Sequence, residues 1–163
     1  MSDSAVRIME ERVLFASDIR PDVNAYLQSA VACADDFERA RELLYQAREL
    51  DPDQLEVYTA LYKFLFYRGQ LDEAEQVAGE ALQRAALNGG FHEDWQQLTS
   101  TSCDWSQENG PARTYLYSLK ALAFISLRKG KHAHGRSLLD KLKQLDPQDL
   151  VGSSVISQLA EAL

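Results

Sequence analysis

A pattern of small and apolar residues that recurs every 34 positions constrains this chain most. Ala40 and Ala74 are 34 residues apart, and Ala47 and Ala81 are separated by the same interval. Around both pairs the apolar residues follow helical spacing, and a glycine or a pair of aspartates divides each helical stretch from the next. A helix–turn–helix unit at a fixed short period predicts stacked hairpins, each burying its apolar face against its neighbours.

Three copies of the unit are expected, over residues 21–54, 55–88 and 116–149. In the second copy, Gly69 suits the left-handed conformation that ends a helix. The third copy has Gly130 in the corresponding turn, with Gly135 and Leu142 at positions where the other copies have alanines. Because Gly69 and Gly130 are 61 residues apart, the third copy follows an insertion of 27 residues, at about 89–115.

The first and third copies both end in Leu-Asp-Pro, at residues 50–52 and 145–147. Asp51 is expected to cap the helix that follows, with Pro52 at its first position and Gln54 completing a capping box.

The small residues have a packing reason. Ala74 and Ala81 allow neighbouring helices to approach closely, whereas a leucine or phenylalanine there would overpack the joint. The bulk that faces them is supplied by aromatic side chains on the preceding helix, Tyr58, Tyr62 and Phe64. An ordinary helical bundle rich in alanine is the alternative.

The 34-residue period and these residues resemble the tetratricopeptide repeat. The resemblance is carried by Tyr58, Leu61, Gly69, Ala74 and Ala81 in the second copy, and by Ala40, Ala47 and Pro52 in the first. It implies an all-α, right-handed superhelix of helix–turn–helix repeats, here one domain over residues 1–163. A helix at Asp3–Phe15 and a capping helix at about 148–163 are expected to flank the repeats.

Proteins of this family usually bind peptides on the concave side, where the first helix of each repeat is exposed. The corresponding face of the first copy has no aromatic or basic side chain. Aromatic and basic side chains alternate on the other two, which suits a peptide with apolar anchors and an acidic group. The alternative is that several of these aromatics pack against the insertion or the N-terminal helix. The expected partner-binding residues are Thr59, Lys63, Phe66, Tyr67, Tyr117, Lys120, Phe124 and Arg128.

Both tryptophans of the chain, Trp95 and Trp105, lie in the insertion. Loops carry function more often than the scaffold does, so this segment is a candidate lid over the groove. The alternative is that the two tryptophans fill a packing gap between the second and third copies.

Charge and composition exclude several classes of function. A net charge of −8 argues against nucleic acid and anionic membranes as partners, and no stretch is apolar enough to span a membrane. The two cysteines form no motif and the start lacks a signal peptide, so a cytoplasmic protein with reduced thiols is expected. His132 and His134 lack a third ligand, and no catalytic motif occurs, so neither a metal, a cofactor nor an enzyme is indicated.

The sequence therefore predicts a protein-interaction adaptor or chaperone-like module that binds a segment of another protein. One alternative is a self-associating structural subunit, such as a homodimer. A second is a small bacterial secretion chaperone, because such chaperones share this length and three-repeat layout; the insertion argues against it.

Overall fold

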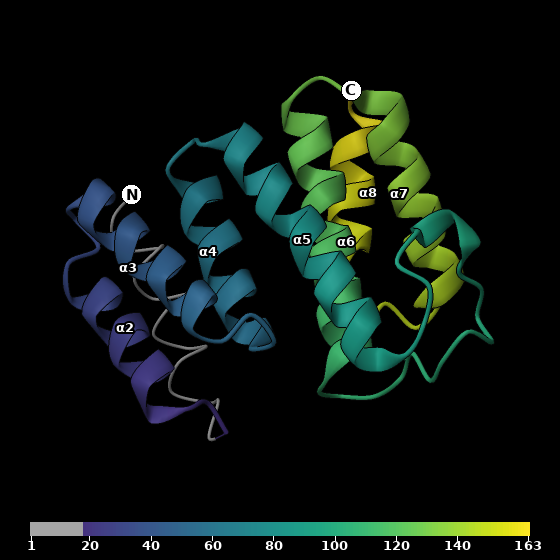
Figure 1. Ribbon diagram of the computed structural model, residues 1–163. Coiled ribbons are helices and arrows are strands. Elements are labelled where there is room, and N and C mark those ends of the chain that lie inside the picture. The colour runs from purple at the N-terminus through teal and green to yellow at the C-terminus, as the bar shows by residue number, and fades with distance from the viewer. Residues whose placement is uncertain (1–17) are drawn as a thin grey trace. The chain divides into compact units, whose positions relative to one another are not determined.

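The computed structural model describes residues 18–163, and all regular structure in this range is helical (Figure 1). The expected all-α fold of helix–turn–helix repeats is confirmed. The expected helix at Asp3–Phe15 lies outside the described residues. The elements are α2 (Pro21–Ala32), α3 (Phe37–Leu50), α4 (Leu55–Tyr67), α5 (Leu71–Gly89), the short 3-10 helix η1 (Trp95–Gln97), α6 (Pro111–Arg128), α7 (His132–Leu145) and α8 (Ser154–Glu161).

The described residues form two compact units, and the boundary between them falls within α5, between Val77 and Ala78. In the first unit α2 and α3 form one hairpin, and α4 packs against α3. In the second unit α6 and α7 form a hairpin on which α8 packs (Figure 1). The expectation of a single domain stays a prediction.

Two hairpin turns are closed by glycines in the left-handed conformation, which was expected for Gly69. Gly69 has φ 75° and Gly130 has φ 78°. After α4 the amide of Gln70 donates to Leu65 O (2.9 Å), and after α6 the amide of Lys131 donates to Ser126 O (2.8 Å). A hydrogen bond from an amide to the carbonyl five residues earlier is characteristic of the Schellman motif. This motif gives partners to carbonyls that the end of a helix would otherwise leave unpaired.

The small residues of the repeat pattern are buried. Ala40, Ala47 and Ala74 in the first unit and Ala81 in the second have no exposed surface. In the third hairpin Gly135 takes this role, because a Cβ there would lie 2.7 Å from Leu127 Cδ2 and 3.3 Å from Ala123 O. An alanine at position 135 would overlap the Leu127 side chain, so glycine allows α6 and α7 to pack closely here.

The expected cap at Asp51 is wrong. Helix α4 begins at Leu55, its N-cap residue is Gln54, and no side chain caps it. Asp51 instead ends α3, and its carboxylate accepts a hydrogen bond from the amide of Asp53 (3.2 Å). Pro52 therefore lies in the turn before α4, not in its first turn.

The last helix is shorter than the expected span of about 148–163, because residues 146–153 form a turn held by carboxylates. Asp146 is buried and accepts from the amides of Leu150 (2.9 Å) and Val151 (3.0 Å). Asp149, at φ 56°, accepts from the amide of Ser154 (3.1 Å), where α8 begins. No helix among the described residues is both long and apolar enough to cross a membrane.

Candidate functional site

Four of the expected partner-binding residues share one face of α4, but they differ in exposure. Thr59 is buried, and its hydroxyl donates to Leu55 O one turn earlier (3.5 Å). Lys63 and Phe66 are half-buried, and Tyr67 is 38 % exposed. The rings of Phe66 and Tyr67 meet edge to face, with centroids 5.6 Å apart. The accessible part of this face therefore lies at the C-terminal end of α4.

The other four lie on one face of α6, in the second unit. Tyr117, Lys120 and Phe124 are half-buried, and Arg128 is exposed. Lys120 Nζ donates to Val151 O in the α7–α8 turn (2.8 Å). One cation expected to bind a partner thus holds a carbonyl of its own chain.

Trp105 belongs to an aromatic cluster at the start of α6. It is only 5 % exposed, its Nε1 donates to Thr99 O (2.9 Å), and its ring packs against Phe91 (5.2 Å) and Tyr115 (6.0 Å). Burial raises the pKa of Tyr115, whose hydroxyl donates to Glu93 O (2.8 Å). This placement supports the alternative in which Trp105 fills a packing gap.

Trp95 is less buried than Trp105 and contacts a different element. It is half-buried in η1, and its ring meets the edge of the exposed His134 on α7, with centroids 6.3 Å apart. A second link joins the insertion to α7, because Lys141 Nζ donates to Leu98 O (2.7 Å). These two contacts hold the insertion against α7. Its role as a lid stays a prediction.

A hollow of about 260 Å³ lies between the insertion and the α7–α8 turn. Cys103 lines it together with Trp105, Asp146 and Leu150. Burial, and then the neighbouring charge of Asp104, raises the pKa of the Cys103 thiol. A raised pKa disfavours the thiolate, which is the reactive form of this side chain.

Sequence reasoning missed a polar cluster that joins α3 to α5 in the first unit. Glu73 Oε1 accepts from Tyr45 Oη (2.5 Å) and from Arg41 Nε (2.8 Å). The guanidinium of Arg48 lies over the Tyr45 ring, 4.6 Å from its centroid. Beside this cluster is an open hollow of about 390 Å³ on α3. Tyr45 and Glu73 are 28 residues apart, so no local pattern signals their contact.

The cluster sets the charge state of Glu73. Burial acts to raise the pKa of this carboxyl, but the hydrogen bonds from Arg41 and Tyr45 outweigh it, and the pKa lies below its usual value. Burial and the bond to Glu73 raise the pKa of Tyr45. The cluster is therefore a carboxylate held between a cation and a neutral phenol.

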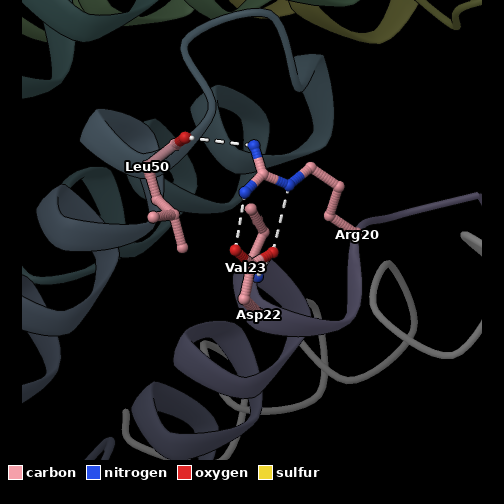
Figure 2. A network of polar contacts seen from close by, with 4 residues as sticks. All are labelled: Arg20, Asp22, Val23 and Leu50. Carbon is pink, nitrogen blue, oxygen red and sulfur yellow. Dashed lines mark hydrogen bonds and ion pairs between the residues drawn. The ribbon is translucent and has the colours of Figure 1, made fainter.

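Two further arginines of the first unit hold backbone carbonyls. Figure 2 shows the Arg20 guanidinium between the carboxylate of Asp22 (2.6 Å) and Leu50 O, at the end of α3 (3.4 Å). Arg68 donates to Ala34 O and lies over the Phe64 ring. Arg20 joins the start of α2 to the end of α3, and Arg68 joins the end of α4 to the turn between α2 and α3.

The described residues contain no group of three or more His, Cys, Asp or Glu side chains that could hold a metal ion. Cys33 and Cys103 are both free thiols.

Comparison with known proteins gives a match to one family over part of the chain. Residues 34–99 match the model of the tetratricopeptide repeat. An uncharacterised 19.8 kDa protein in the nifW 5′ region of Azotobacter chroococcum mcd 1 is 28% identical over 119 residues, which are 72% of this chain and 67% of that protein. No solved structure matches the chain.

Proposed function

Because residues 34–99 are tetratricopeptide-repeat sequence, we propose that this chain is an adaptor or chaperone-like module that binds a peptide segment of another protein. Such repeats suggest protein–protein interaction, and they are typically not enzymes. The observation that carries the proposal is this family match. A role in the cytoplasm is part of the same proposal, supported by the two free cysteines.

The proposed groove residues, which the family resemblance implies, are the four on the α4 face of the first unit and the four on the α6 face of the second. Phe66 and Tyr67 are the proposed apolar anchors, because their adjoining rings remain partly accessible at the end of α4. Lys120 has a smaller proposed part, because its ammonium already holds Val151 O.

The experiment is a comparative pull-down from native lysate with Tyr67→Ala and with Leu87→Ala as matched control. Both residues are exposed large apolar side chains on helices, but Leu87 lies on α5, outside the proposed groove. We expect one partner in stoichiometric amount with the wild type and with Leu87→Ala, and its loss with Tyr67→Ala. Equal recovery by both variants would exclude this end of α4 as the contact.

A second candidate function is self-association as a structural subunit. A specific observation favours it: Val155 and Leu159, one turn apart on α8, are both exposed apolar side chains.

A further inference from the structure

The hollow between the insertion and the α7–α8 turn is built from two segments of the second unit that are far apart in the sequence. Its volume is about 260 Å³, and both segments line it, the insertion with residues 100 and 103–106 and the turn with residues 145–148 and 150. Part of its wall is apolar and accessible, because Pro147 is exposed and Leu150 is 41 % exposed. The hollow is therefore a product of the tertiary fold and not of one helix surface.

Every charged side chain among the described residues that line this hollow is acidic. Asp104 comes from the insertion and Asp146 from the turn, with no lysine, arginine or histidine beside them in the lining. Lys120 reaches the same turn, but its ammonium contacts Val151 O (2.8 Å). Neither aspartate forms an ion pair with a described residue. The hollow thus gathers negative charge that no cation of the described chain neutralises.

Asp146 carries the strongest part of this argument, because it is only 4 % exposed. Its Oδ1 accepts from the amide of Leu150 (2.9 Å) and its Oδ2 from the amide of Val151 (3.0 Å). Each carboxylate oxygen can accept two hydrogen bonds, so each of these has room for one more. Buried aspartates are normally paired with an opposite charge. The two amides therefore hold the carboxylate in place and leave its charge available to a ligand.

Asp104 supplies a second, more accessible carboxylate. Its Oδ1 accepts from the amide of Ser106 (3.1 Å) and from the hydroxyl of Ser106 (2.5 Å), whereas its Oδ2 accepts no hydrogen bond from a described residue. The bonds from Ser106 lower the pKa of Asp104, so this carboxyl stays ionised. One of its oxygens is therefore fixed by the loop and the other is open to a donor.

We propose that this hollow binds an arginine side chain of a partner protein, with the guanidinium at the two carboxylates and the methylene stem against the apolar wall. A guanidinium carries several donors in a planar fork and is more weakly hydrated than an ammonium, so it suits a site with two separate carboxylates. Its apolar stem buries readily on surfaces such as Pro147 and Leu150. An arginine within a peptide has no free α-carboxylate, which the acidic wall would repel. The protein source of the arginine rests on the proposed function.

Cys103 lines the hollow and reports whether it is occupied. In the full chain with Cys33→Ala, Cys103 is the only thiol, and mass spectrometry measures its alkylation by iodoacetamide, a neutral reagent. N-acetyl-arginine amide is expected to slow this reaction saturably, with half of the effect at about millimolar concentration for so small a ligand. N-acetyl-citrulline amide has nearly the same shape but a neutral head group. At equal ionic strength it is expected to give no protection over the same range.

A matched pair of variants tests the role of charge. Asp104→Asn keeps an oxygen that accepts the bonds from Ser106 and removes the negative charge. Half-protection should then need about two- to fivefold more of the arginine probe, as expected for one accessible ion pair. Asp140→Asn removes an exposed carboxylate of α7 that does not line this hollow, and it should leave protection unchanged. Circular dichroism checks that both variants are folded.

Equal protection by the arginine and citrulline probes, or protection by neither, would overturn the arginine site. Wild-type affinity in Asp104→Asn would overturn the role of the carboxylates. Protection by free arginine but not by the blocked amide would overturn the protein source. The pull-down with Tyr67→Ala does not depend on any of these results, so failure of the arginine site and failure of the proposed function are distinguishable.

Discussion

The two units carry the same kind of helical hairpin but stabilise it with different chemistry. In the first unit, acidic residues outnumber basic ones by 16 to 8, and the Arg41–Tyr45–Glu73 cluster joins α3 to α5. In the second unit the charges balance, and its distinctive contacts are the Phe91–Trp105–Tyr115 cluster and the close approach at Gly135. The difference teaches that a repeat pattern specifies where helices meet, but not which interaction holds them there.

Replacement of Trp105 tests the packing side of this comparison and should have the largest effect. Trp105→Ala removes a ring that is 5 % exposed and leaves a cavity, so the free energy of unfolding should fall by about 3–5 kcal/mol in urea denaturation. Trp95→Ala is the control, and its half-buried ring should matter less than half as much. Trp105→Phe keeps an aromatic ring and gives a folded variant if alanine does not. Equal effects at the two tryptophans would contradict the assignment of Trp105 to the core.

A pair of glycine substitutions tests the close approach of α6 and α7. Gly135→Ala places a Cβ 2.7 Å from Leu127 Cδ2, so overpacking should lower the free energy of unfolding by about 1–3 kcal/mol. Gly79 is also a helical glycine, but a Cβ there would meet nothing within 4 Å. Gly79→Ala should therefore raise the free energy of unfolding by about 0.5–1 kcal/mol, because alanine favours helix. The two variants should move the urea midpoint in opposite directions, and a shared sign would refute the packing reason for Gly135.

The polar cluster of the first unit should respond to pH. The pKa of Glu73 is lowered from 4.5 in the folded chain, so its stabilising contribution is present above pH 4.5 and is lost as the pH falls through the folded pKa. The protection of first-unit amides relative to their intrinsic exchange rates should therefore decrease below this pH, and Glu73→Gln should weaken that dependence.

Tyr45→Phe removes one hydrogen bond of the same cluster and should cost about 0.5–1.5 kcal/mol near neutral pH. Protection of amides in residues 78–163 provides the internal reference for both variants. A pH response of equal size in both units would show that the comparison between them is wrong.

The Arg20 network in Figure 2 should give the smallest effect. Arg20 and Asp22 are about half exposed, and an exposed ion pair contributes little to stability. Arg20→Ala should leave the urea midpoint unchanged and accelerate amide exchange only in the first turn of α2, where the Asp22 carboxylate accepts from the amide of Val23 (2.9 Å). A clear shift of the midpoint would mean that the bond to Leu50 O matters more than its exposure suggests.

Local signals in the sequence predicted the fold well. Gly69 and Gly130 act through their own backbone conformation, and the buried alanines act through a fixed period, so both were readable from spacing alone. Asp51 shows the limit of such patterns, because an Asp-Pro pair suits a helix start and a turn equally well.

Contacts between distant residues were not readable. The bond from Lys120 to Val151 O spans 31 residues, and spacing places Lys120 on a helix face without indicating a partner. The two tryptophans look alike in the sequence, and only the fold separates the buried Trp105 from the half-buried Trp95. Of the candidate site, spacing therefore predicted which residues share each helix face, but not how accessible each one is.

The lysines that hold backbone carbonyls give the chain built-in reporters of local opening. Lys120 and Lys141 donate to Val151 O (2.8 Å) and Leu98 O (2.7 Å), and both side chains are half-buried. An amine engaged in this way should react more slowly with an acylating reagent than the exposed Lys143. Mass-spectrometric footprinting of these three amines would therefore record how often the α7–α8 turn and the insertion detach from the third hairpin, without any introduced label.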